Sequence, residues 1–362
     1  MAQAYNAIIA TITVASDASQ VVKTMVKSTT WREGTSGTWL STNCTLTAGN
    51  TYQFRTPLSG MSSDSTAILP NIKASVTVAW DTTATPISTV GDFFMTGYAS
   101  DCSSLTSLSV PDTSGLTSVG NGFMAYYAYG CTNLTSLSVP DTSGLTSVGN
   151  FFMFYYAYGC TSLTSLSAPD TSGLTSVGYY FMYSYADSCT NLTSLSVPDT
   201  SGLTSVGDNF MTYYAYGCTN LTSLSVPDTS ELTSVGDFFM YSYAQGCSSL
   251  TSLSVPDTSG FTSIGDYFMD YYAGECSSLT SLILPDSTGW FGSHNVDWNV
   301  PSGRLGYLYG YTPNSTSQTA WRALTVSGKT LYTNYIRAEN HVLLSTTPVI
   351  GAKYPLPPFR IS

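Results

Sequence analysis

The sequence predicts an α/β solenoid of seven strand-turn-helix repeats, each 29 residues long. Three observations predict this fold class. A fixed period of about 20 to 50 residues is typical of stacked repeat proteins. Within each period, one stretch has the spacing of a helix and another has the alternation of a strand. The period is set by seven cysteines that recur every 29 residues: Cys102, Cys131, Cys160, Cys189, Cys218, Cys247 and Cys276.

The first half of each repeat predicts a short helix. Five residue types are identical in all seven copies, at offsets of 0, 1, 4, 5 and 8, and such offsets form one stripe of a helix. In the first copy they are Phe94, Met95, Tyr98, Ala99 and Cys102. The residue before this stretch, Asp92 or Asn121, is a suitable helix N-cap.

The second half of each repeat predicts a strand and a turn. Leu108 and Val110 alternate with serine, as in a half-buried strand. An Asp-Thr-Ser-Gly segment follows, beginning at Asp112 in the first copy. Its aspartates recur every 29 residues, so they either form a column that binds cations or cap their own turns as Asx-turns. The uniform repetition favours Asx-turns.

These repeats divide the chain into three parts. We predict a β-rich N-terminal cap or attachment domain over residues 1–80, the solenoid over 81–289, and an irregular C-terminal cap with an extended tail over 290–362. The tryptophans support this division because none of them lies within the repeats, and the flanks must close the open ends of the stack. They are Trp31, Trp39, Trp80, Trp290, Trp298 and Trp321.

The repeat pattern GCxxLTSLxxPxxxxLTSVGxxxF resembles the BspA-type leucine-rich repeats of bacterial and protist surface proteins. The resemblance covers about 200 of the 362 residues, and each unit is several residues longer than usual. It implies a right-handed solenoid that is often used in adhesion. It implies no catalytic residues.

The seven repeated cysteines share one position on the predicted buried stripe. We predict a structural column of reduced thiols that pack as small hydrophobic groups. Disulfides between adjacent coils are less favoured because the stacked Cβ vectors run parallel, whereas the bond needs a specific dihedral angle. A zinc site is also less favoured, since the repeats contain no CxxC motif and no nearby histidine. We therefore predict no metal and no cofactor.

Charge and composition exclude several classes of function. Only 9% of residues are charged, the net charge is -11, and no lysine or arginine lies between Lys73 and Arg304. Such a chain does not suit a nucleic-acid partner. It has no apolar run long enough to insert in a membrane and no motif of a known catalytic site, so we predict a non-enzyme. We expect an extracellular, cell-surface or virion location without a recognisable signal peptide, although reduced thiols also suit folding in the cytoplasm.

The positions that vary between copies give the best functional clue. Four positions per copy vary, and fifteen of these 28 residues are aromatic. Exposed aromatic patches mark interaction surfaces, and tyrosine mixed with small polar residues resembles an antibody paratope. We name these fifteen residues the aromatic face: Phe93, Tyr126, Tyr129, Phe151, Phe154, Tyr155, Tyr158, Tyr180, Tyr183, Tyr213, Tyr216, Phe238, Tyr241, Tyr267 and Tyr271.

Three interpretations of the aromatic face remain open. It binds a surface glycan or protein in adhesion or recognition. Alternatively, it contacts copies of the same chain, as in a self-assembling structural subunit of an extracellular filament or virus-like particle. In the third interpretation, the rings only pack against each other between coils, or a terminal segment covers them.

Overall fold

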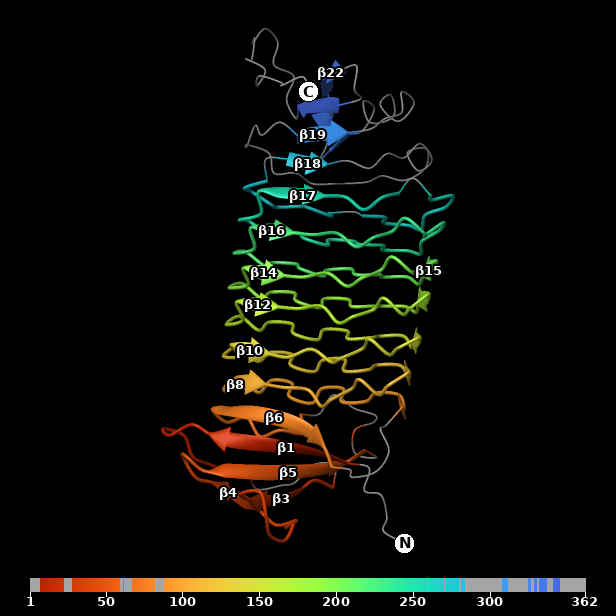
Figure 1. Cartoon of the computed structure of the whole chain (residues 1–362). Helices are drawn as coiled ribbons and strands as arrows, with labels where there is room; N and C mark the ends of the chain where they lie inside the picture. Colours follow the sequence, from red (N-terminus) through yellow and green to blue (C-terminus); the bar gives the residue numbers. More distant parts are fainter. Residues whose placement is uncertain are drawn as a thin grey trace, which may run out of the picture.

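The computed structural model shows a straight stack of flat coils with an antiparallel sheet at its N-terminal end (Figure 1). It describes residues 7–22, 28–58, 61, 67–81, 88–258, 260–269, 271–279 and 281–283, and after these only five short strands between 308 and 345. These residues contain strands and turns but no α-helix. Within the same part of the chain, no helix could cross a bilayer.

The N-terminal sheet is built around β1 (Ala7–Val14). This strand pairs antiparallel with β5 (Thr51–Pro57) on one side and with β6 (Ala74–Trp80) on the other. Strand β3 (Thr30–Glu33) follows β5, while β2 (Gln20–Val22) and β4 (Cys44–Leu46) form a separate pair. Buried and exposed residues alternate along β6, which places one face of the sheet in the core.

The N-terminal sheet continues directly into the solenoid. Strand β6 pairs in parallel with β8 (Leu105–Leu108), the first strand of the repeats. The indole ring of Trp80 stacks on Phe94 with centroids 5.5 Å apart, and its Nε1–H donates to the carbonyl of Asp112. Residues 74–80 therefore act as a further layer of the stack and close its N-terminal end.

Two ladders of very short parallel strands run along the stack. Paired strands are 29 residues apart, as Ser107 and Ser136 are, and each ladder is divided into separate short sheets. The first ladder contains β8, β10 (Ser136–Leu137), β12 (Ser165–Leu166), β14 (Ser194–Leu195), β16 (Ser223–Leu224), β17 (Ser252–Ser254) and β18 (Ser281–Ile283). The second contains β7 (Thr89–Val90), β9 (Ser118–Val119), β11 (Ser147–Val148), β13 (Ser176–Val177) and β15 (Ser205–Val206).

The predicted helix, and with it the α/β class, is wrong. In its place each coil contains a chain of turns in which left-handed residues recur at alternate positions. In the first coil these are Phe93, Met95 and Gly97, with φ between 55° and 63°. Asp92 is not a helix N-cap, because its Oδ1 accepts the backbone N–H of Asn121 in the next coil at 2.7 Å.

Hydrogen bonds between coils explain this conformation. The backbone N–H of Tyr98 donates to the carbonyl oxygen of Met95 in its own coil at 3.2 Å. The backbone N–H of Ala99 instead donates to the carbonyl oxygen of Tyr127 in the next coil at 2.8 Å. A helix would satisfy all of its N–H groups internally, but packed helices need about 8 to 10 Å between their axes. Adjacent strands lie only about 4.8 Å apart. A straight stack with this spacing therefore has no room for a helical layer.

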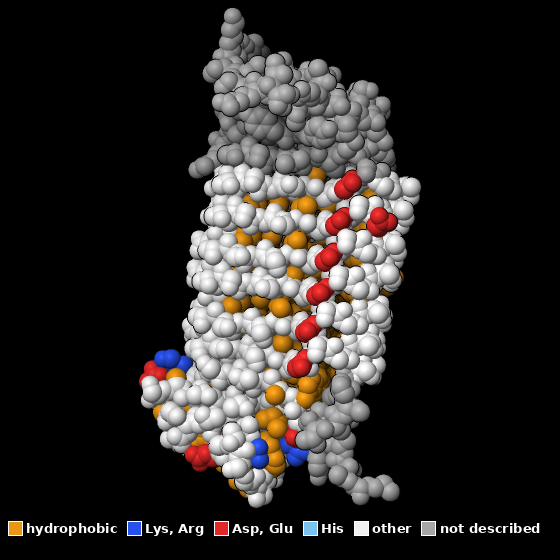
Figure 2. Space-filling view, viewed as in Figure 1, with side chains coloured by type: hydrophobic (Ala, Val, Ile, Leu, Met, Phe, Trp, Pro, Cys, Tyr) orange, Lys and Arg blue, Asp and Glu red, His pale blue; other side chains and the backbone are white. Residues whose placement is uncertain are grey.

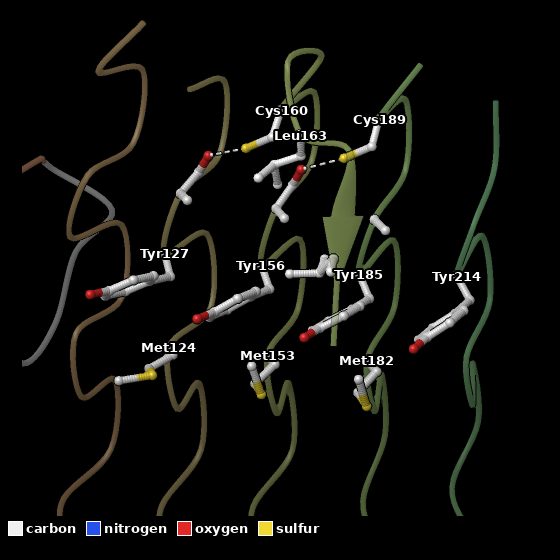
Figure 3. Packing of buried hydrophobic residues seen from close by; sticks show 14 of the residues in the cluster. Met124, Tyr127, Met153, Tyr156, Cys160, Leu163, Met182, Tyr185, Cys189 and Tyr214 are labelled. Carbon is white, nitrogen blue, oxygen red and sulfur yellow. Dashed lines mark hydrogen bonds between the residues drawn. The ribbon is translucent and has the colours of Figure 1, made fainter. Parts of the chain in front are cut away.

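The core consists of columns of identical side chains (Figure 3). The Phe94 and Tyr98 columns stack face to face, with centroids 5.4 to 5.7 Å apart between coils. Each buried tyrosine after the first donates its hydroxyl to a strand carbonyl, as Tyr156 does to Ser138 at 2.6 Å. Burial of the five predicted core positions is thus the same with turns as it would be with a helix.

Beyond β18 the structure describes only the strands β19 (Leu308–Tyr311), β20 (Thr325–Val326), β21 (Lys329–Thr330), β22 (Tyr332–Ile336) and β23 (His341–Ser345). Strand β23 pairs antiparallel with both β19 and β22. The rest of the predicted C-terminal cap and tail lies outside the described residues.

Candidate binding face

The aromatic face lies on the turn layer and is half-buried. Phe93, Phe151 and Tyr267 are exposed by 42%, 37% and 53%. The other twelve members are partly buried. Several non-aromatic residues at equivalent positions, such as Ser184 and Thr212, are buried completely. The four variable positions therefore do not form one free surface of a helix. They form columns in which the large side chains protrude and the small ones recede.

Each of these aromatic rings, Phe93 apart, packs against at least one neighbouring ring. Along the stack, Tyr129 lies on Tyr158 with centroids 4.8 Å apart, and Phe151 lies on Tyr180 at 4.9 Å. Within a coil, neighbouring rings meet edge to face, as Phe151 and Phe154 do at 5.5 Å. Such pairs each contribute about 0.5 to 1.5 kcal/mol beyond the area that they bury. The rings pack between coils and keep exposed edges at the same time.

The turn layer sets the direction of these side chains. Tyr126, Tyr155 and Tyr213 all have φ between 55° and 57°. A left-handed tyrosine is costly, and it persists because the surrounding hydrogen bonds determine its conformation. At the N-terminal end, Gly122 leaves the space that the Phe93 ring fills, since a Cβ there would lie 2.5 Å from Phe93 Cδ1.

Burial raises the pKa of four tyrosines of the face, Tyr126, Tyr158, Tyr183 and Tyr213, so their hydroxyls are neutral at neutral pH. Burial, together with the neighbouring phenols of Tyr241 and Tyr216, raises the pKa of Tyr213 to about 12. Burial and the neighbouring phenol of Tyr155 raise the pKa of Tyr126 as well. These four tyrosines thus offer neutral hydroxyl groups, which can both donate and accept hydrogen bonds.

Asp187 is one of the non-aromatic members of the variable columns, and it was absent from the predicted binding residues. Asp187 occupies the position held by Tyr158 one coil before it and by Tyr216 one coil after it. It is only 7% exposed. Its Oδ1 accepts from Ser188 Oγ at 2.7 Å and its Oδ2 from Ser184 Oγ at 3.1 Å. Burial raises its pKa to about 6. The sequence feature that could have indicated this residue is a carboxylate between two tyrosines at equivalent positions, Tyr158 and Tyr216.

The aspartate column lies on another side of the coil, along the turns, and is visible as a line of red atoms in Figure 2. In the first five copies the carboxylate caps its own turn. Asp112 accepts from Ser114 N–H at 3.1 Å and from Ser114 Oγ at 2.7 Å, and the same arrangement recurs at Asp141, Asp170 and Asp199. This is the Asx-turn interpretation. Among the described residues, no group of three or more potential ligands could hold a metal ion.

The cysteine column is buried beneath the turn layer. All seven repeat cysteines and Cys44 are free thiols. Cys160 Sγ lies 3.1 Å from the carbonyl oxygen of Ala128 and Cys189 Sγ lies 3.1 Å from that of Ala157 (Figure 3). Burial raises the pKa of Cys160 well above its ordinary value. These thiols pack and donate weakly to backbone carbonyls, and they are not reactive groups.

A column-forming core, two parallel strand ladders and a fixed 29-residue period define a solenoid repeat protein. The chain belongs to the BspA-type leucine-rich repeat family, whose family model matches residues 97–294. That match contains six copies, so the solenoid has about six stacked coils of about 29 residues, and the count of seven is not supported. A comparison with curated proteins gives no match.

Proposed function

We propose that this protein is a non-catalytic, surface-exposed repeat protein that acts in adhesion or recognition on a cell surface or virion. Its partner is a surface glycan or protein, bound by the aromatic face. One observation carries the proposal: fourteen of the fifteen rings are held partly exposed in stacked or edge-to-face contacts with other rings, such as Phe154 on Tyr155 at 4.5 Å.

Preorganisation supports a binding role. A ring whose position is already fixed loses little conformational freedom when a partner docks, and this reduces the cost of association. Tyrosine contributes a rigid apolar body together with a hydroxyl group. The small residues at equivalent positions, such as Ser242 and Thr212, are buried, so the surface is lower there than at the rings.

The family supports a scaffold role rather than catalysis. BspA-type repeats occur generally in surface and adhesion proteins. Asp187 is the most strongly buried acid of the described repeats. Its carboxylate accepts hydrogen bonds from two serine hydroxyls, an arrangement that suits a structural role. We therefore propose that this chain binds a partner and does not catalyse a reaction.

Self-assembly is the second candidate, and the segregation of charge favours it. Residues 101–285 contain fourteen acids and no lysine or arginine, so all eleven bases lie toward the two ends of the chain. Rods with acidic bodies repel each other side by side. Contacts that involve the ends, as in a filament or a virus-like particle, are electrostatically better.

The test is a triple variant, Tyr126→Ala, Tyr155→Ala and Tyr213→Ala, assayed on glycan and protein arrays beside the wild-type chain. The matched control is Tyr179→Ala, because Tyr179 is 52% exposed and lies outside the aromatic face. We expect loss of binding in the triple variant only. An unchanged array profile of the folded triple variant would reject the aromatic face as the binding surface.

Sedimentation separates the two candidates. If recognition is the function, the wild-type chain stays monomeric at micromolar concentration and still binds an array ligand. If assembly is the function, the wild-type chain sediments as a concentration-dependent oligomer, and the triple variant or raised salt shifts it toward the monomer.

A further inference from the structure

The variable column that contains Asp187 holds a break in the stacked rings. Tyr129 and Tyr158 stack in the second and third coils, and Tyr216 stands in the fifth. In the coil between Tyr158 and Tyr216, the shorter Asp187 takes the place of a ring and folds inward. A tyrosine reaches further out than an aspartate. The outer part of this coil therefore lacks the ring that its neighbours carry.

Among the described residues, no aromatic ring stacks face to face on Tyr216. Its ring contact there is the edge-to-face one with Tyr213 at 5.5 Å. Tyr158 stacks with Tyr129 on the side away from Asp187. Tyr158 and Tyr216 thus lie one coil before and one coil after Asp187, and the π-face of a tyrosine attracts a cation by its quadrupole.

The spacing of the coils suits a cation in this break. Stacked rings at equivalent positions in successive coils lie 4.7 to 5.7 Å apart. A group bound at the level of the Asp187 coil is therefore about one such spacing from both Tyr158 and Tyr216. Cation–π attraction operates within about 6 Å of a ring centroid.

Within the described part of the chain, the carboxylate of Asp187 has no cationic partner. None of the ion pairs in the described residues involves it, and the nearest lysine or arginine in the sequence is more than a hundred residues away in either direction. Burying an ionised carboxylate without a cation is unfavourable. A bound cation would supply the missing charge.

We infer that Asp187, Tyr158 and Tyr216 form a binding site for a quaternary alkylammonium group, such as the trimethylammonium of choline. This inference rests on the proposed function and specifies the chemistry that the aromatic face recognises. Both carboxylate oxygens already accept a hydrogen bond from a serine hydroxyl. The site thus offers charge and ring faces more than free acceptors, which favours a cation without N–H donors over a primary ammonium.

The first experiment compares two ligands that have the same shape and differ in charge. The full chain is titrated at pH 7.5 with choline and with 3,3-dimethyl-1-butanol, its neutral isostere, by calorimetry and tyrosine fluorescence. We expect choline to bind about tenfold more tightly, which corresponds to about 1.4 kcal/mol. Methylammonium chloride should bind more weakly than choline. Equal affinities for choline and the alcohol, or stronger binding of methylammonium, would overturn the inference.

The second experiment uses variants. Asp187→Asn removes the charge, and we expect choline affinity to fall about tenfold to that of the neutral alcohol. Asp187→Tyr fills the break with a ring, as in the adjacent coils, and should abolish binding. Glu231→Gln is the matched control, because it removes an exposed carboxylate on a turn of the same solenoid and should leave choline binding unchanged.

The variants also separate this inference from the proposed function. Thermal unfolding of both Asp187 variants confirms that they are folded. If a folded Asp187→Asn chain binds choline as the wild type does, the ammonium site is wrong. The adhesive role is then judged separately by the triple tyrosine variant on the arrays. Loss of choline binding in both Asp187 variants, with the control unchanged, supports the site.

Discussion

The indole of Trp80 and the phenyl ring of Phe94 stack with centroids 5.5 Å apart and planes inclined by 24°. Trp80 ends the last strand of the N-terminal sheet, and Phe94 begins the first column of the solenoid core. The stack of phenylalanines is thereby extended by one aromatic layer. A β-rich N-terminal region thus terminates a repeat array that would otherwise expose its apolar end to water.

Trp80→Ala is expected to destabilise the solenoid by about 3 kcal/mol, because it removes this ring from the end of the core together with its hydrogen bond to Asp112. Urea denaturation would show a lower midpoint at an unchanged slope. The exposed Tyr179→Ala variant serves as the control and should change stability by less than about 0.5 kcal/mol. Equal midpoints for the two variants would show that Trp80 does not close the stack.

Tyr185→Phe tests the hydroxyls of the buried tyrosine column. The Tyr185 hydroxyl donates to the carbonyl of Ser167 at 2.6 Å, and its removal leaves that carbonyl without this donor. We expect a loss of about 1 to 2 kcal/mol. Tyr267→Phe, at a ring that is 53% exposed, should be close to neutral in the same denaturation experiment. A neutral Tyr185→Phe would mean that the column is held by stacking alone.

Two glycines should respond differently to replacement by alanine. A Cβ at Gly159 would have open space, with its nearest neighbour at 3.9 Å, so Gly159→Ala costs only the left-handed strain, about 1 kcal/mol. A Cβ at Gly149 would lie 2.5 Å from the backbone nitrogen of Asn121. Gly149→Ala must therefore push adjacent coils apart, and we expect a loss of about 3 kcal/mol or more. Thermal unfolding of both variants checks the order, and the reverse order would contradict the observed coil spacing.

Asp187 makes stability depend on pH in a direction opposite to most acids. Burial raises its pKa to about 6 from an ordinary value of 3.8. Between these two values the unfolded chain releases the proton while the folded chain retains it. Stability from this group is therefore full below about pH 3.8 and is lost as the pH rises to about 6. The expected loss is about 3 kcal/mol.

The measurement is the pH dependence of urea unfolding between pH 4 and 7, compared with Asp187→Asn, in which this component should disappear. The titratable groups that interact with Asp187, including Tyr158, Tyr213 and Cys189, stay neutral over this range, because burial raises the pKa of each of them. If the two proteins have the same pH dependence, Asp187 does not titrate as its burial requires.

The period and the composition of the core could be read from the sequence alone. The five invariant positions are the buried ones in every described coil because stacking identical units brings equivalent residues into contact. The Asx-turns at Asp112 and its equivalents follow from local chemistry within four residues. The aromatic residues were recognisable as a group for the same reason, since they stand at repeated positions.

The helix was wrong for a reason that the periodicity does not reveal. Offsets of 0, 1, 4, 5 and 8 fit one face of a helix, and they also fit turns whose buried residues recur every four positions. Only the spacing between coils distinguishes them. In a straight stack, Phe93 and Met95 take left-handed conformations so that the N–H groups of Phe93 and Gly97 reach the next coil.

The sequence by itself therefore determined the 29-residue unit, the identity of the core columns and the absence of basic residues from the repeats. The first two depend on contacts between equivalent residues or on local turns. The tertiary structure alone decided that the outer layer is a chain of turns, and that Asp187 lies buried between Tyr158 and Tyr216. Both depend on the distance between stacked coils, which no single repeat contains.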